Sequence, residues 1–266
     1  MNAKGNAPKT CIVTGATGAI GSAICKGIAK KGGEYRLIAV CRNAAKAGKL
    51  ENSLRAKYPE AEIKTELVDL SSKKEVFSFA SRLKEPVSVL INNAATTPIQ
   101  RLETPEGIEL QFATNVLGYY WMIEALKDHL SSAKGRVVNV ASFWAGDMDI
   151  DDLEFKRRPY DNNTAYRQSK QANRMLTVFH AEKLHKSGVT VNACHPGEVN
   201  SKLANNLGFG GHESPEKGAE TPLWLATTEA GSSNTGKYFE YLKMVKCRFA
   251  SDKNAIQKLA SICSSI

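Results

Sequence analysis

The sequence predicts an α/β fold in which helices cover both faces of a doubly wound, mostly parallel sheet. Seven short apolar segments of strand character alternate with helical patterns that are long enough to connect parallel strands. Several of these segments are apolar without interruption, as strands buried on both faces are. The length of 266 residues fits one α/β domain with a single core, spanning the whole chain.

Each predicted strand is a short run rich in β-branched and other apolar side chains. In chain order these runs are Cys11–Thr14, Leu37–Val40, Ile63–Val68, Val87–Ile91, Val137–Ala141, Val189–Ala193 and Gly236–Phe239. The core therefore extends over about residues 9–240, and residues 241–266 are expected to form a C-terminal tail.

Capping residues mark where the helices between these strands begin and end. Pro59 ends the helix after the second strand, and Ser72 with Glu75 begins the next one. Thr104-Pro105 has the form of an N-cap and first helical position, which predicts a helix through about Leu126. Ser214-Pro215 begins another helix, and a long helix lies between the fifth and sixth strands.

Charge, apolar content and cysteine pattern argue against a nucleic-acid-binding, a secreted and a membrane-spanning protein. The net charge of +9 comes from basic residues spread along the chain, which favours a small anionic ligand over nucleic acid. Residues 1–9 carry no signal-peptide pattern, and no later stretch is apolar enough to span a membrane. The six scattered cysteines lack any C-x-x-C pair and indicate reduced thiols. We expect a cytoplasmic protein without a metal site.

Gly15, Gly18 and Gly21 lie directly between the first strand and the first helix. Glycines there let the backbone approach a pyrophosphate, and the helix N-terminus offers free N–H groups. An ordinary turn is the alternative, but the position favours a dinucleotide. Arg42 follows the second strand, where a carboxylate would bind an unphosphorylated ribose. It indicates a 2′-phosphate and hence NADP(H), unless it simply faces solvent.

Other polar residues follow the remaining strands. Asp69 could accept a hydrogen bond from adenine or could equally belong to a turn. Asn92 and Asn93 follow the fourth strand, and Ser142 and His195-Pro196-Gly197 follow the fifth and sixth. The carboxyl ends of parallel strands share one edge, so one crevice is expected to collect these residues.

Tyr166 and Lys170 are four residues apart and share one face of the predicted helix. The ammonium group is expected to lower the pKa of the phenol, so that Tyr166 could act as a general acid or base. Taken alone, the five residues would more often be a surface helix.

In this combination and order the motifs resemble the short-chain dehydrogenases/reductases over roughly residues 9–240. The resemblance implies a Rossmann fold with strand order 3-2-1-4-5-6-7. Finer features are similar to the retinol-dehydrogenase-like branch, which also contains carbonyl reductases; these are Cys41-Arg42-Asn43, Asn115–Gly118, Asp152–Phe155 and His195–Val199.

The resemblance also implies site residues. Tyr166 would transfer the proton, Ser142 would bind the substrate oxygen, Lys170 would bind the nicotinamide ribose, and Asn115 would help hold a water near Lys170. The implied cofactor-binding residues are Gly15, Thr17, Gly18, Ile20, Gly21, Arg42, Asp69, Leu70, Asn93, Ala94, Tyr166, Lys170, Pro196, Gly197 and Val199.

The chain also departs from the pattern of this branch. Its glycine spacing is G-x-x-G-x-x-G instead of G-x-x-x-G-x-G, which leaves the contacts to the phosphates open. The segment Phe143–Pro159 lengthens the distance between Ser142 and Tyr166 and is expected to form a loop near the substrate mouth. The glycine-rich stretch Asn200–Ser214 is expected to be either a lid over the substrate or a disordered surface loop without a function. Membrane-anchored relatives have a leading apolar segment that is missing here, which disfavours retinol as substrate.

These features predict an NADP(H)-dependent oxidoreductase that reduces a carbonyl, or oxidises the alcohol, of a small or medium apolar substrate. The alternative is a non-catalytic NADP(H)-binding sensor or scaffold, which would have no need of Ser142, Tyr166 and Lys170 together. The helix near 166–184 carries more apolar surface than one stripe needs, which favours a homodimer, whereas the segment Phe143–Pro159 could cover such a face and leave a monomer.

Overall fold

The computed structural model describes residues 7–266, so the expectation about the first residues of the chain partly lies outside the described part. One sheet with strand order β3-β2-β1-β4-β5-β6-β7-β8 forms its centre. The strands are β1 (Lys9–Thr14), β2 (Tyr35–Cys41), β3 (Glu62–Leu67), β4 (Val87–Asn92), β5 (Arg136–Val140), β6 (Thr190–His195), β7 (Tyr238–Glu240) and β8 (Lys243–Val245). The predicted Rossmann order of the first seven strands is confirmed, and those strands pair in parallel.

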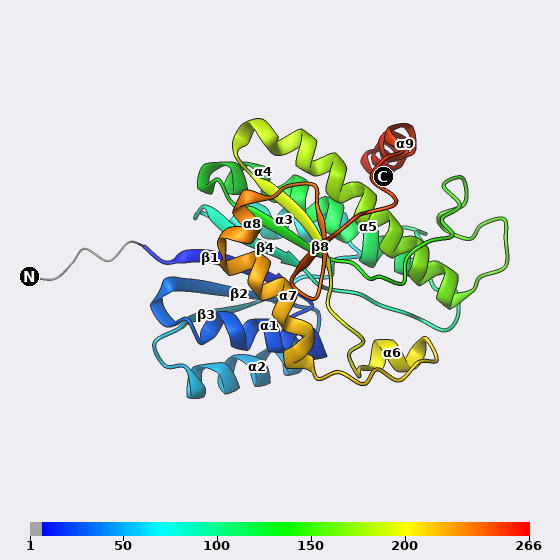
Figure 1. The fold of residues 1–266 in the computed structure, drawn as a ribbon. Helices are drawn as coiled ribbons and strands as arrows, with labels where there is room; N and C mark the ends of the chain where they lie inside the picture. Colours follow the sequence, from blue (N-terminus) through cyan, green and yellow to red (C-terminus); the bar gives the residue numbers. More distant parts are fainter. Residues whose placement is uncertain (1–6) are drawn as a thin grey trace, which may run out of the picture.

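Helices cover both faces of this sheet (Figure 1). The α-helices are α1 (Ala19–Ala29), α2 (Ala44–Lys57), α3 (Lys73–Arg82), α4 (Gly118–Ala133), α5 (Asn162–Leu184), α6 (Lys202–Asn206), α7 (Pro215–Thr227), α8 (Glu229–Ser233) and α9 (Lys253–Ser265). Short 3₁₀ turns lie at Gly32–Glu34 and His185–Ser187, and a π-helix lies at Phe112–Leu117. Among residues 7–266 no helix has the length and apolar character that crossing a membrane requires.

Alternate strand residues point into two separate apolar layers, which explains why the strands have continuous apolar sequences. On one side Ile12 and Val137 pack with the buried faces of α3, α4, α5 and α9. On the other side Val13 and Val138 pack with α1, α2 and α7. The sheet is thus buried on both faces, and its open edge at the carboxyl ends of the strands is left for the site.

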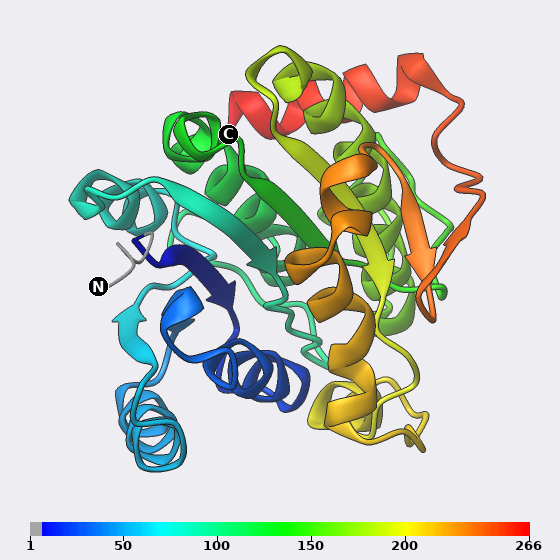
Figure 2. The same ribbon diagram turned by 60° about the vertical axis from the view of Figure 1, so that its left-hand side comes forward.

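The C-terminal region differs from the predicted tail. β8 pairs with β7 in antiparallel orientation and adds an eighth strand to the sheet. The α9 helix buries Ile256, Leu259 and Cys263 in the same core cluster as Met175 and Leu176 of α5. Figure 2 shows this helix on the side of the sheet where α4 and α5 lie. The extra apolar surface of α5 is therefore covered within the chain, and the homodimer stays a prediction that light scattering can decide.

The helix predicted from Thr104 to Leu126 is wrong at its beginning. Gly107 has a φ of 78°, and the Thr104 hydroxyl accepts hydrogen bonds from the Glu106 and Ile108 amides, so these residues form a turn. The Glu109 carboxylate instead accepts from the amides of Gln111 and Phe112 and begins the helical segment. The sequence predicted an N-cap at Thr104, but the helical segment begins after Glu109. No sequence motif had indicated that Glu109 would cap it.

Candidate active site

A cleft of about 700 Å³ opens at the carboxyl ends of β1, β2, β4, β5 and β6. All fifteen residues predicted to bind the cofactor line this cleft, and Ser142 lines it with them. Asn115 does not. The sheet edge therefore brings residues that are far apart in the sequence into one site, as the doubly wound topology requires.

The glycine turn is fixed by contacts with the segment that follows β4. Gly15 has a φ of 63°, and a Cβ atom at this position would lie 2.7 Å from the Cα atom of Ala94. The Thr14 hydroxyl accepts from the amides of Asn93 (2.9 Å) and Ala94 (3.1 Å), and the Asn93 side-chain amide donates to the Thr14 carbonyl at 2.9 Å. Hydrogen bonds to the residues that follow the neighbouring strand β4 therefore hold this turn in place.

Gly18 is the N-cap residue of α1, in extended conformation. A Cβ atom there would meet only the Gly15 carbonyl oxygen, at 3.3 Å, so the cleft side of the position is open. The amides of the first turn of α1 have no intrahelical partner. Together they form a cradle that fits a pyrophosphate, because an anion at a helix N-terminus is favoured by both the free N–H groups and the dipole.

Two cations flank the far end of this cradle. Arg42 follows β2, and Lys46 lies in the first turn of α2, where both side chains are exposed and line the cleft. Within residues 7–266 neither side chain takes part in an ion pair. The sequence reasoning missed Lys46, although its position four residues after Arg42 was the available signal.

Asp69 forms the turn that was one of the two alternatives the sequence left open. Its carboxylate accepts from the Ser71 amide at 2.9 Å and the Ser71 hydroxyl at 2.7 Å, so it stabilises the turn after β3. It also lines the cleft beside Leu70. The turn is observed, and the contact with adenine stays a prediction.

Ser142, Tyr166 and Lys170 lie together at the centre of the cleft, and all three side chains are buried. Asp161 caps the N-terminus of α5, which presents Tyr166 and Lys170 from successive turns. The Ser142 hydroxyl group accepts from the Trp144 amide at 3.0 Å. The Lys170 ammonium group donates to the Val140 carbonyl at 3.0 Å and lies 5.6 Å from the centre of the Tyr166 ring.

The pKa of Tyr166 is raised and not lowered, contrary to the expectation drawn from Lys170. Burial raises the pKa of Tyr166 to about 12, and the hydrogen bond from Ser142 offsets only part of this rise. Burial also lowers the pKa of Lys170 to about 7. Desolvation prevails because the ammonium group is directed to Val140 and not to the phenol.

Asn115 lies in the π-helix, outside the cleft. Its side-chain oxygen accepts from the Thr96 amide at 2.8 Å, and its side-chain nitrogen donates to the Thr96 carbonyl at 3.0 Å. The same nitrogen lies 3.4 Å from the Ser169 hydroxyl. Asn115 therefore positions the chain after β4 against α5, and its role in holding a water stays a prediction.

Apolar side chains form the other end of the cleft. They come from three distant segments and are Pro98, Phe143, Trp144, Leu203 and Phe209. The Trp144 ring lies 6.1 Å from the Tyr166 ring and 5.2 Å from the Phe209 ring, measured between centroids. No sequence motif had singled out these aromatic residues, because their proximity depends on how two long loops fold.

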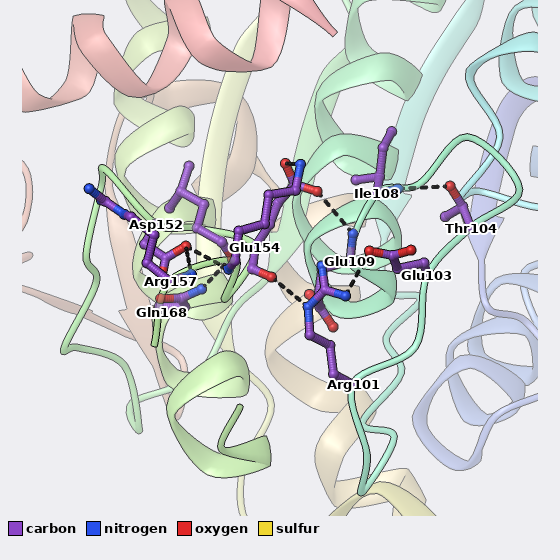
Figure 3. Close-up of polar contacts among 11 residues, drawn as sticks. Arg101, Glu103, Thr104, Ile108, Glu109, Asp152, Glu154, Arg157 and Gln168 are labelled. Atoms are coloured by element: carbon purple, nitrogen blue, oxygen red, sulfur yellow. Dashed lines mark hydrogen bonds and ion pairs between the residues drawn. The ribbon is translucent and has the colours of Figure 1, made fainter. Parts of the chain in front are cut away.

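The first of these loops is the long segment after Ser142, and Figure 3 shows how it is held. The Arg101 guanidinium group donates to the Glu154 carbonyl at 2.9 Å, and the Glu154 carboxylate accepts from the Glu109 amide at 3.1 Å. Asp152 is buried and accepts from the amides of Lys156 and Arg158. We call this set of contacts the 101–158 network; it fixes the loop behind the substrate end of the cleft.

The second loop is the predicted lid, residues 200–214, which contains α6. The Asn206 side chain donates to the Thr97 carbonyl at 3.2 Å, and the Asn206 carbonyl accepts from the Asn162 side chain at 2.9 Å. At the other end, the Glu213 carboxylate accepts from the Glu198 amide at 2.5 Å. The segment covers the apolar end of the cleft, and its motion stays a prediction.

Known proteins share this architecture. The sequence pattern of the short chain dehydrogenases matches residues 9–209. Retinol dehydrogenase 13 of Mus musculus is 34% identical over 256 residues, which cover 88% of this chain and 76% of that protein. Among solved structures, an uncharacterised protein of Mycobacterium paratuberculosis has a TM-score of 0.80 at 23% identity, covering 98% of this chain and 96% of its own. NADPH-bound carbonyl reductase from chicken fatty liver has a TM-score of 0.69 at 19% identity, covering 91% and 100%. The chain belongs to the short-chain dehydrogenase/reductase family, and is an oxidoreductase of that family.

Proposed function

We propose that this protein is an NADP(H)-dependent reductase of small or medium apolar carbonyl compounds. The observation that carries the proposal is one cleft with a pyrophosphate cradle and two exposed cations at one end, apolar side chains at the other, and Ser142, Tyr166 and Lys170 between them. A protein that only binds the cofactor has no use for three buried polar side chains facing its substrate end.

The residues at the cofactor end fit NADP(H) for physical reasons. The first amides of α1 would hold the pyrophosphate, and Arg42 and Lys46 would pair with the 2′-phosphate. Gly197 has a φ of 101°, and a Cβ atom there would meet the Glu213 side chain, so a glycine fits this position in the segment Pro196–Val199 that lines the cleft. The cofactor would supply the hydride.

The chain itself would supply a proton and two oriented hydroxyl groups. Negative charge develops on the carbonyl oxygen during reduction, and donors fixed toward that oxygen stabilise the transition state more than the ground state. The pKa of Tyr166, near 12, keeps its proton on the phenol at neutral pH. In the reductive direction this phenol would donate its proton to the substrate oxygen, with Ser142 as second donor.

The apolar end supports a substrate without a charged group near the reacting carbon. Phe143, Trp144 and Phe209 offer flat contact surfaces, and Pro98 and Leu203 line the same end of the cleft. Retinaldehyde belongs in the test panel because the relatives named as retinol dehydrogenases align over most of this chain. The six free thiols, five of them buried, support a reducing compartment such as the cytoplasm.

The direct test is consumption of NADPH by the purified protein with a panel of aldehydes, ketones, quinones and retinaldehyde. We expect turnover of at least one apolar carbonyl, and none in the Tyr166→Phe variant. Tight NADPH binding without turnover of any member of the panel would instead support a cofactor-binding sensor or scaffold.

A further inference from the structure

The hairpin formed by β7 and β8 has an unusual turn. Tyr241 and Leu242 are the two residues between Glu240 and Lys243, which pair with each other across the hairpin. Both turn residues have a positive φ, 48° for Tyr241 and 63° for Leu242. Two-residue turns of this kind usually contain Asn and Gly, because bulky side chains are strained in the left-handed region. The chain therefore has two large side chains at positions where stability alone favours small ones.

These large side chains gain little burial from their strained positions. Tyr241 is 49% exposed and Leu242 is 41% exposed, and Met244 and Val245 of β8 are exposed as well. Among residues 7–266 β8 is the last strand of the sheet, and Figure 2 shows the hairpin, in orange, at that edge. Strained residues that stay exposed point to a contact with something outside the chain.

The exposed apolar surface continues from the hairpin to the mouth of the cleft. The rings of Tyr241 and Phe143 pack on the two sides of the His195 ring, at 5.8 and 4.7 Å between centroids, and Phe143 lines the cleft. The next residue, Trp144, packs edge-on against Phe209 of the lid at 5.2 Å. We call the exposed members of this surface the apolar rim; they are Phe143, Phe209, Tyr241, Leu242, Met244 and Val245. Single exposed apolar side chains are ordinary, whereas a contiguous set beside a cleft marks an interaction surface.

Exposed cations accompany the apolar rim. They are Lys202 on α6, Lys243 and Lys246 in and after β8, and Arg248, which donates to the Ala145 carbonyl at 2.6 Å. In the described part of the chain none of these four cations takes part in an ion pair. The carboxylates near the turn do have partners: Glu240 lies 3.8 Å from Arg174, and Glu198 lies 3.4 Å from His212. Glu213 accepts from the Glu198 amide. The cations are therefore the charges that remain available to a partner.

An anionic lipid surface fits this combination better than another protein does. Apolar side chains at a hairpin tip can enter the interface of a bilayer, where tyrosine is favoured, and lysines are attracted to anionic headgroups. A second copy of the chain would bring the lysines of one rim against those of the other, which disfavours the contact. A protein on the rim would also cover the mouth of the cleft, whereas a lipid surface is itself a source of apolar compounds.

We propose that the apolar rim docks this protein on the surface of an anionic lipid bilayer, with Tyr241 and Leu242 among the headgroups and the mouth of the cleft toward the lipid. The docking does not depend on the reductase activity. Its consequence for substrate uptake rests on the proposed function, because only then does an apolar carbonyl compound in the bilayer gain a short path to Tyr166.

Sedimentation of the full chain with vesicles of phosphatidylcholine and phosphatidylserine tests the docking. The double variant Tyr241→Asn, Leu242→Gly gives the turn its preferred residues, so denaturant unfolding should show it to be at least as stable as the wild type. Its partition coefficient for the vesicles should nevertheless fall about tenfold or more, because two inserting side chains are lost. Phe77→Ser is the matched control, since Phe77 on α3 is similarly exposed and lies outside the rim; its binding should equal that of the wild type.

The charge of the rim is tested separately. Replacing Lys243 and Lys246 with Gln should weaken binding about fivefold for each lysine removed, and only when the vesicles contain phosphatidylserine. Lys73→Gln with Lys74→Gln is the control, because it removes the same charge from exposed positions at the beginning of α3 and should leave binding unchanged.

The proposal is overturned if the wild type does not sediment with the vesicles, or if the Tyr241→Asn, Leu242→Gly variant binds as the wild type does. Light scattering adds a further outcome: a dimer that this variant abolishes, without vesicle binding by the wild type, would assign the rim to a second copy and refute the docking. Vesicle binding without NADPH consumption on any carbonyl would support the docking and refute the reductase. Turnover without vesicle binding would refute the docking alone.

Discussion

The two ends of the cleft are built in different ways. The cofactor end is made of backbone at the ends of neighbouring strands of the sheet, and hydrogen bonds between these strand ends, such as those between Thr14 and Asn93, hold it. The substrate end is made of side chains from two long loops outside the sheet, which the 101–158 network and the Asn206 contacts hold. The comparison teaches that affinity for the cofactor depends on backbone that the sheet fixes, whereas substrate choice depends on how separate loops pack.

The largest effect on turnover is expected at Tyr166, where the two ends of the cleft meet. Tyr166→Phe removes the proton donor but keeps the buried ring, so kcat should fall by about 10² to 10⁴ while the dissociation constant of NADPH changes little. Stopped-flow kinetics and fluorescence titration measure the two quantities. Tyr35→Phe, at the amino end of β2, is a matched control that should retain both. Near-normal turnover in Tyr166→Phe would show that another group provides the proton.

Replacing Lys170 should have opposite effects on function and on stability. Lys170→Met is expected to weaken both turnover and NADPH binding. The pKa of Lys170 is lowered to about 7 from 10.5, so the folded state binds fewer protons than the unfolded state between these values. Stability of the wild type should therefore rise as the pH increases from 7 to 10.5.

Below pH 7 the buried charge carries its full cost, so the ligand-free Lys170→Met variant should be more stable there by on the order of 1 to 4 kcal/mol. This advantage should fade toward pH 10.5. Denaturant unfolding at several pH values measures it, and a variant that is less stable than the wild type at pH 6 would contradict the expectation.

The cofactor end and the order of the strands could be predicted because the signals are local. Gly15, Gly18 and Gly21 fall between a strand and a helix, and this position restricts both backbone and ligand. The order of the strands is then enough to place Ser142 and Tyr166 at the same edge of the sheet. Lys46 was within reach of the same reasoning, since it lies in the first turn of the helix that begins just after Arg42.

The substrate end could not be predicted, because no short pattern encodes it. Trp144 meets Phe209 only after both loops have folded, and the turn at Gly107 overrides the apparent cap at Thr104. The pKa of Tyr166 was mispredicted for the same reason: neighbours four residues apart can be read from the sequence, whereas the degree of burial comes from the whole fold.

A smaller effect, on the affinity for NADPH, is expected at the cofactor end. Arg42→Ala should weaken NADPH binding by about 1.5 to 3 kcal/mol, because a charge-assisted contact with the 2′-phosphate is lost, and should leave NADH binding unchanged. Lys46→Ala should act in the same direction. Lys49→Ala, one turn further along α2 and outside the cleft, is the control. Calorimetric titration with both cofactors measures the difference, and equal losses for NADPH and NADH would refute the assignment.

The smallest effect concerns the 101–158 network and appears in stability instead of catalysis. Glu109 is fully buried, and burial raises the pKa of its carboxyl group to about 7, although the amides of Gln111 and Phe112 and the charge of Arg101 lower it in part. The folded state then binds more protons than the unfolded state between pH 4.5 and 7. The contribution of Glu109 to stability is present below pH 4.5 and is lost as the pH rises through 7.

Glu109→Gln keeps an oxygen that can accept from one of the two amides and cannot ionise. We expect the variant to equal or exceed the wild type in stability above pH 7, by about 1 to 2 kcal/mol, and to lose that advantage near pH 5. Glu103→Gln, at an exposed position where the carboxylate pairs with Arg101, is the control and should show no such crossover. If unfolding curves of Glu109→Gln and wild type keep a constant separation from pH 5 to 8, Glu109 does not titrate in this range. The substrate end would then be held by a carboxylate that is charged throughout, stabilised by Arg101 and the two amides more strongly than its burial indicates.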